Sequence, residues 1–257
     1  MNTLKTRGIA LTSYELFEQD KIVTFYTQNF GMLKAVAKGA RKIKSRFAPV
    51  VQFPSYVDIY IYKRESSQMG TLTDCRTRYL FPKIRTNIFR FAYASYVAEI
   101  LLGSLKGEEQ NHALFSLLLK AFFLLEDKKE EDFDILICSF KLKLLYILGY
   151  TPEFRICVEC GRKRDFFISF YFNLQKGGIL CERCQGEDFQ AIGVPKLTVL
   201  AMDYMMRNGM SCSFKPQIHK VKKQINFLLD AYFLYHVNSN EKKNNSQGLI
   251  KQLEKLR

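Results

Sequence analysis

The stretch Tyr56–Tyr62, which reads YVDIYIY, decides the fold of the N-terminal part of the chain. Its aliphatic residues Val57, Ile59 and Ile61 alternate with tyrosines and Asp58. Side chains of a β-strand point alternately to the two faces of a sheet, so this pattern predicts a strand with an aliphatic, buried face and an aromatic, outer face. We expect the whole strand to run over Val50–Tyr62.

Four further β-rich segments accompany this strand within the first 80 residues. They are Leu4–Leu11, Ile22–Thr27, Met32–Lys38 and Thr71–Arg78, and turn-prone or polar residues separate them. Five short strands in about 80 residues suit a small closed barrel, and the five-stranded OB-fold is a barrel of this kind that also binds nucleic acid. The sequence therefore predicts an OB-fold β-barrel in residues 1–80.

From Pro82 onward the apolar residues recur with the period of a helix. The predicted helices are Asn87–Leu102, Asn111–Leu125, Asp132–Leu148, Pro195–Asn208 and Ile218–Val237. The third of these has Asp132 as its expected N-cap and Gly149 as its expected stop.

The chain is therefore expected to be an α+β multidomain protein, with a helical domain that follows the barrel and is interrupted by a cysteine-bearing insert. After the barrel, the two parts of the helical domain are expected at residues 81–150 and 191–237, with the insert between them at residues 151–190. Residues 238–257 are expected to form a polar C-terminal tail with a short amphipathic end.

The insert carries two CxxC pairs, Cys157 with Cys160 and Cys181 with Cys184. Two such pairs can bring four thiolates to the corners of a tetrahedron about 2.3 Å from one zinc ion. Four sulfurs leave no open coordination position, so the predicted zinc is structural and forms a zinc knuckle. A redox-active dithiol is the alternative for either pair.

The net charge of +14 is unevenly distributed along the chain. Residues 1–80 hold 13 Lys and Arg against 6 Asp and Glu, residues 191–257 hold 11 against 4, and the middle of the chain is balanced. Positive charge confined to the two ends favours a polyanion as the binding partner.

One acid-free stretch of 13 residues concentrates this charge. It contains six cations, Lys34, Lys38, Arg41, Lys42, Lys44 and Arg46, which we predict to contact DNA phosphates without reading sequence. A solvated loop is the alternative interpretation. Phe47, next to these cations, is a weaker candidate for stacking on an unpaired base.

Motifs for catalysis, export and membrane insertion are missing from the sequence. It contains no phosphate-binding GxxxxGK[ST] loop and no HExxH, and its three histidines lie far apart. We therefore expect a protein without enzymatic activity that acts in the reducing cytoplasm and away from membranes.

Two segments resemble the RecO family of bacterial recombination-mediator proteins. The stretch Asp20–Phe53, especially AVAKGARKIKSRF, is similar to the family's barrel, and LGYTPEF followed by GGILCERC in Leu148–Cys184 is similar to its zinc region. The resemblance implies an OB-fold, a helical domain and a zinc knuckle. It also implies binding of single- and double-stranded DNA, strand annealing, and loading of the RecA recombinase together with RecR and the single-stranded-DNA-binding protein.

The resemblance carries over residue by residue. It assigns the six cations as DNA contacts and the four paired cysteines as zinc ligands. Lys141 and Lys143 are a weak candidate for the surface that binds the single-stranded-DNA-binding protein. An RNA-binding zinc-ribbon protein and a zinc-dependent nuclease or deaminase are the competing interpretations, and the latter would need an open metal position.

Overall fold

The computed structural model describes residues 2–64, 66–105, 107, 110–185, 191–212, 215–237 and 245–255. The chain divides into two compact units. The first comprises Met1–Asp127 together with Asn244–Arg257, and the second comprises Lys128–Lys243. The C-terminal helix thus belongs to the same unit as the N-terminal strands.

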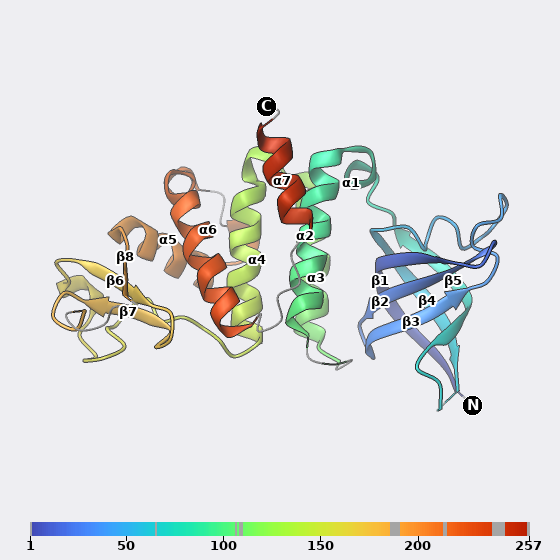
Figure 1. The fold of residues 1–257 in the computed structure, drawn as a ribbon, viewed down its shortest axis with the longest axis horizontal. Coiled ribbons are helices and arrows are strands. Elements are labelled where there is room, and N and C mark those ends of the chain that lie inside the picture. Colours follow the sequence, from blue (N-terminus) through green and yellow to red (C-terminus); the bar gives the residue numbers. More distant parts are fainter. Residues whose placement is uncertain are drawn as a thin grey trace. The chain divides into compact units, whose positions relative to one another are not determined.

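The first unit begins with a closed barrel of five strands (Figure 1). They are β1 (Asn2–Leu16), β2 (Asp20–Thr27), β3 (Gly31–Ala37), β4 (Ser55–Lys63) and β5 (Gly70–Tyr79). Around the barrel the order is β1-β2-β3-β5-β4, with β1 paired to both β2 and β4 and with β3 parallel to β5. This arrangement confirms the predicted OB-fold.

The interior of the barrel is filled by the aliphatic face of β4 and its neighbours. Val57 and Ile59 are 0% exposed and Ile61 is 1% exposed, whereas Asp58 and Tyr60 are only partly buried. The alternation predicted from the sequence is therefore confirmed. Its consequence is that polar and aromatic side chains of the strands lie on the outer surface of the barrel.

Two strand boundaries differ from the prediction. β4 begins at Ser55 rather than at Val50, because Pro54 has no N–H to donate to a strand ladder. β1 is longer than the predicted Leu4–Leu11, since it pairs along its length with two neighbours. A register shift between Ala10 and Thr12 bends it around the barrel.

The described residues of the first unit also form the helices α1 (Pro82–Thr86), α2 (Ile88–Ser104), α3 (His112–Asp127) and α7 (Asn245–Lys255). α1 was not predicted because five residues are too few to show a helical period. The predicted tail, residues 238–257, contains α7, which packs against α2, while residues 238–244 lie outside the described residues. Ser246 at the start of α7 donates from its hydroxyl (2.7 Å) and its N–H (3.2 Å) to Glu99 of α2.

A buried carboxylate of α3 holds the start of α1. Glu126 is 5% exposed and accepts hydrogen bonds from the N–H groups of Lys83 (2.9 Å) and Ile84 (3.0 Å). The residue at the N-cap of α1, Phe81, offers no side-chain cap. Glu126 thus supplies from another helix the acceptors that the first turn of α1 lacks.

In the second unit, helix α4 (Phe133–Ile147) packs against α5 (Lys196–Arg207) and α6 (Pro216–His236). A three-stranded sheet of order β7-β6-β8 lies between α4 and α5 in the sequence, with β6 at Phe170–Asn173, β7 at Gly178–Cys181 and β8 at Ala191–Gly193. Three single-turn 3₁₀ helices are η1 (Glu130–Asp132), η2 (Arg164–Phe166) and η3 (Met210–Cys212).

Both ends of helix α4 were predicted from the sequence. Gly149 follows the helix with a left-handed φ of 84°, which confirms it as the stop. Asp132 occupies the N-cap position, as predicted, but its side chain makes no cap hydrogen bond. Its carboxylate instead lies 3.2 Å from the ring of His219 on α6. Among the described residues, no helix has the length and apolar character needed to cross a membrane.

We predict that Glu126→Ala lowers the free energy of unfolding by about 2 kcal/mol, because two N–H groups in the first turn of α1 lose their acceptor. Urea unfolding followed by circular dichroism measures this change. Glu131→Ala is the matched control, since Glu131 is exposed and the ammonium of Lys129, with which it pairs, lies 3.9 Å away. Equal stabilities of the two variants would contradict the capping role of Glu126.

Candidate functional site

The four paired cysteines come together in the second unit. Cys157 and Cys160 flank a turn, Cys181 ends β7, and Cys184 lies in the turn that follows. Their sulfur atoms all lie within 4.8 Å of one another, and the Sγ atoms of Cys160 and Cys181 are 3.8 Å apart. A tetrahedron with metal–sulfur bonds of about 2.3 Å has edges of about 3.8 Å, so the sulfurs are spaced to hold a metal ion.

Backbone hydrogen bonds and glycines shape the two knuckles. Cys157 donates its N–H to the carbonyl of Arg162 (2.8 Å) and accepts from the N–H of Gly161 (2.9 Å), whose φ is 72°. Gly178 lies under the first knuckle, where an added Cβ would sit 2.4 Å from Cγ1 of Val158. Gly161 therefore stands where the chain turns, and Gly178 stands where two segments approach closely.

The protein environment already stabilises negative charge on one sulfur. Burial disfavours the thiolate of Cys157, but N–H groups of Cys160, Cys181 and Glu159 hydrogen-bond to its sulfur and lower the pKa of the thiol to about 7. Burial and the neighbouring sulfurs raise the pKa of Cys184. A cation that binds here would therefore release protons from the remaining thiols.

An ion pair joins the two knuckles. Arg162, just after the first pair of cysteines, donates to Glu182 at 2.6 Å, and Glu182 lies within the second pair. The N–H groups of Glu182 itself and of Ile168, together with Arg162, hold the pKa of the Glu182 carboxyl at about 2. This contact fixes the two knuckles beside each other at neutral pH.

The six predicted DNA contacts all have exposed side chains on the barrel unit. Lys34 lies on β3, which ends at Ala37, so Lys38 stands in the following turn rather than in the strand as predicted. We call residues 38–46 the basic loop. Lys34 and the loop lysines Lys38, Lys42 and Lys44 form no ion pair with the described residues.

The two arginines of the basic loop are engaged with the barrel. Arg41 lies 3.2 Å from the carboxylate of Glu15 on β1. Arg46 lies 3.3 Å from Asp74 and donates to the carbonyl of Thr73 at 2.7 Å, both on β5. The arginines therefore anchor the loop, and the lysines keep their charge available for a ligand.

The prediction that Phe47 could stack on a base is wrong. Phe47 is 7% exposed and belongs to the barrel core, with the guanidinium of Arg46 4.9 Å from its ring centroid. The exposed apolar side chains near the loop are instead Ile43 (102%) and Phe17 (84%). Both are single hydrophobic residues in polar turns, and no sequence pattern distinguishes them from core residues.

The suggested partner surface at Lys141 and Lys143 is also wrong. Lys141 is 2% exposed and pairs with Asp230 of α6. Lys143 donates to the carbonyl of Met206 on α5. Both side chains connect helices of the second unit instead of facing solvent, because α5 and α6 cover the face of α4 that carries them.

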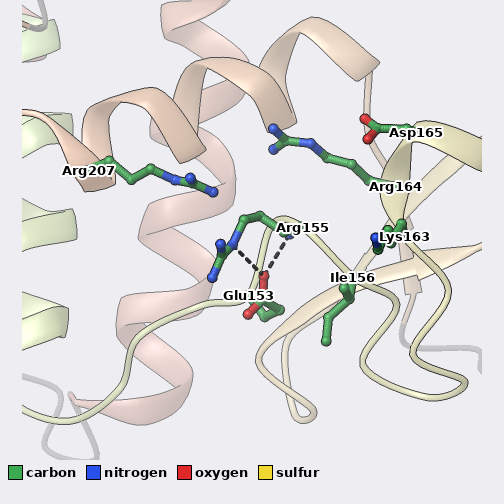
Figure 2. A pocket seen from close by; sticks show the side chains of 7 residues that line it. All are labelled: Glu153, Arg155, Ile156, Lys163, Arg164, Asp165 and Arg207. Carbon is green, nitrogen blue, oxygen red and sulfur yellow. Dashed lines mark hydrogen bonds and ion pairs between the residues drawn. The ribbon is translucent and has the colours of Figure 1, made fainter.

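A cavity of 440 Å³ lies beside the first knuckle (Figure 2). Its lining residues are Glu153, Arg155, Ile156, Lys163, Arg164, Asp165 and Arg207. Arg164 and Arg207 both pair with Asp203, at 2.7 and 2.8 Å, and Figure 2 shows Arg155 turned toward Glu153. Most of the positive charge is therefore neutralised within the protein.

Together these features define a class of protein: a basic OB-barrel joined to helices, with four clustered cysteines that can hold a metal ion. Comparison with known protein families supports this class. Residues 1–81 match the family model for the N-terminal part of recombination protein O, and residues 85–245 match the model for its C-terminal part. The chain belongs to the RecO family.

Similar curated proteins extend over nearly the whole chain. A protein of Thermoanaerobacter sp. (strain X514) is 31% identical over 238 residues, covering 92% of this chain and 94% of its own length. One from Listeria monocytogenes serotype 4b (strain CLIP80459) is 32% identical, with 89% and 88% covered, and one from Alkaliphilus metalliredigens is 29% identical, with 91% and 94% covered. Each carries the name DNA repair protein RecO.

We predict that Lys141→Ala lowers the free energy of unfolding by about 3 kcal/mol, since it empties a buried site and removes the partner of Asp230. Lys120→Ala, on the exposed face of α3, should change stability by less than about 0.5 kcal/mol. Thermal and urea unfolding measure both. A Lys141→Ala protein as stable as the parent would show that the side chain is not structural.

Proposed function

We propose that this RecO-family chain is a non-enzymatic DNA-repair protein. It binds single- and double-stranded DNA, anneals complementary strands and helps to load the RecA recombinase together with RecR. The observation that carries the proposal is the basic loop, whose exposed lysines have no ion pair with described residues, on an OB-fold barrel.

The chemistry of the lysines suits binding without sequence preference. An ammonium group is a mobile point charge that can meet phosphates of any nucleotide. Neutralising phosphates on two strands lowers their mutual repulsion, and bases that stay uncovered remain free to pair. Annealing by this route requires no catalytic group.

The metal of the four-cysteine centre is proposed to be zinc. Soft thiolates in a tetrahedral set favour zinc, and four of them leave no position for a reactive water. The residues Cys157, Cys160, Cys181 and Cys184 would hold the ion, and its contribution is to keep the two knuckles folded. The closed donor set argues against a zinc-dependent nuclease or deaminase.

The partners follow from family membership alone. RecR and the single-stranded-DNA-binding protein are proposed to bind this chain directly, RecA is reached indirectly, and the site of action is the cytoplasm. Lys141 and Lys143 are engaged between helices and are not part of either partner surface.

We predict that replacing Lys38, Lys42 and Lys44 together by alanine weakens binding to any DNA sequence. Three lost phosphate contacts should reduce the slope of log affinity against log salt by about 2 for a single strand. Fluorescence anisotropy at several salt concentrations measures this slope. The arginines of the loop are left in place, so that its anchors on β1 and β5 persist.

A matched control removes three exposed cations of the second unit that lie outside the two basic ends of the chain, Lys129, Lys163 and Arg183. Its net charge equals that of the loop variant, so it separates a local contact from a general charge effect. Strand annealing is measured with the same proteins, and RNA competes against DNA in a parallel titration. Undiminished DNA binding by the loop variant would reject the proposed role of the basic loop.

We further predict one zinc ion per chain. Cobalt substitution should produce the intense sulfur-to-metal absorption of a tetrathiolate site, and Cys181→Ser should lose the metal and destabilise the second unit. Cys75→Ser, in the barrel, is the control and should retain the metal. A spectrum with three sulfurs and a water ligand would contradict the structural role.

A further inference from the structure

The outer surface of the barrel contains a groove of 580 Å³ whose lining includes no residue of the basic loop. We call it the barrel groove, and it is lined by Lys5, Thr6, Arg7, Gln28, Asn29, Asp58, Tyr60, Arg76 and Arg78. Its volume is within the range of about 300–1,000 Å³ typical of small-ligand sites.

The strand register places these residues together. Lys5 of β1 is paired with Tyr60 of β4, and Arg7 is paired with Asp58. Asp58 in turn faces Arg76 of β5. Three adjacent strands therefore direct a row of polar side chains outward on one side of the barrel.

The groove is strongly cationic. Arg78 donates to Asp58 at 2.7 Å, which accounts for the one carboxylate in the lining. Lys5, Arg7 and Arg76 have exposed side chains and form no ion pair with the part of the chain that is described. Three positive charges therefore face solvent without a counterion from the protein's described residues, as is required of a site for an anionic ligand.

The barrel groove and the basic loop share a border on β5. Arg46 of the loop binds Thr73 and Asp74 of this strand. Asp74 is paired in register with Tyr60, and the hydroxyl of Thr73 donates to the carbonyl of Tyr60 at 3.0 Å. The phosphates of a nucleic-acid strand that passes Arg46, at the end of the loop, are therefore next to the barrel groove.

Two further features of the lining suit nucleotides. The half-buried ring of Tyr60 offers a π surface, with Nζ of Lys5 5.4 Å from its centroid. Gln28 and Asn29, at the turn after β2, offer side-chain amides that can hydrogen-bond base edges. An acidic polypeptide would also pair with the cations and hydrogen-bond to the amides, so the feature that favours a nucleotide is the ring of Tyr60, on which a base can stack.

We propose that the barrel groove is a second contact for single-stranded nucleic acid, continuous with the basic loop. Lys5, Arg7 and Arg76 bind its phosphates and Tyr60 stacks on a base. This inference rests on the proposed DNA-binding function and adds to it a defined path. The path makes the bound segment longer than the loop alone can cover.

The first test replaces Lys5, Arg7 and Arg76 together by alanine in the full chain and keeps the Arg78–Asp58 pair. Affinity for an oligothymidylate of about 30 nucleotides should fall at least about tenfold, and the salt slope should fall by about 2. An oligothymidylate of about 8 nucleotides, within the length covered by one OB-fold, should lose less because the basic loop alone can hold it. The charge-matched variant of Lys129, Lys163 and Arg183 should bind both oligonucleotides as the parent does.

The second test uses the absence of tryptophan from the chain. In a Tyr60→Trp protein the fluorescence of the single indole should be quenched by the oligothymidylate, because a stacked base contacts the ring. Phe166→Trp, at a position 64% exposed in the second unit, is the control and should stay unquenched.

The outcomes separate this inference from the proposed function. In the first case, the basic-loop variant loses affinity but the groove variant keeps the parent's affinity and salt slope. In the same case, the oligothymidylate does not change the indole fluorescence of the Tyr60→Trp protein. The groove inference then fails and the proposed function stands. If neither variant loses affinity, both fail. If polyglutamate quenches the indole as well as the oligothymidylate does at equal charge, the assignment of the groove to nucleic acid is overturned.

Discussion

Closure of the five-stranded barrel is the constraint on which the N-terminal unit depends. A closed sheet has no free edge, and its small interior accepts only apolar side chains such as Val57, Ile59 and Ile61. Every second residue of each strand must then lie outside. The cations of β1 and β5 are consequently presented together on the outer surface, where they can meet a polyanion.

The two arginines of the basic loop differ from its lysines in the contacts that they make. Arg41 and Arg46 are bound to acids and carbonyls of the barrel, and the lysines between and before them are not. A guanidinium is suited to fixed, directional hydrogen bonds, while an ammonium on a flexible stem suits variable phosphate positions. The loop is thus held at defined points and remains adaptable elsewhere.

The second unit depends on a different constraint, the convergence of four sulfurs. Its sheet strands have only three or four residues, and short strands of this size do not stabilise a sheet by themselves. The Arg162–Glu182 pair joins the two knuckles, and the four sulfurs lie close enough together to hold a metal ion between them. A metal in this position would contribute to folding directly.

Local patterns in the sequence determined the barrel, the principal helices, the stop at Gly149 and the proximity of the paired cysteines. The patterns are strand alternation, helical period and CxxC spacing, and each depends only on residues that are close together in the chain. Tertiary structure decided which polar residues are available. It buried Phe47 and Lys141, engaged Arg46 with β5, and gathered Lys5, Arg7 and Arg76 into one groove. Burial and ion pairing depend on residues distant in the chain, and a single sequence carries no record of those contacts.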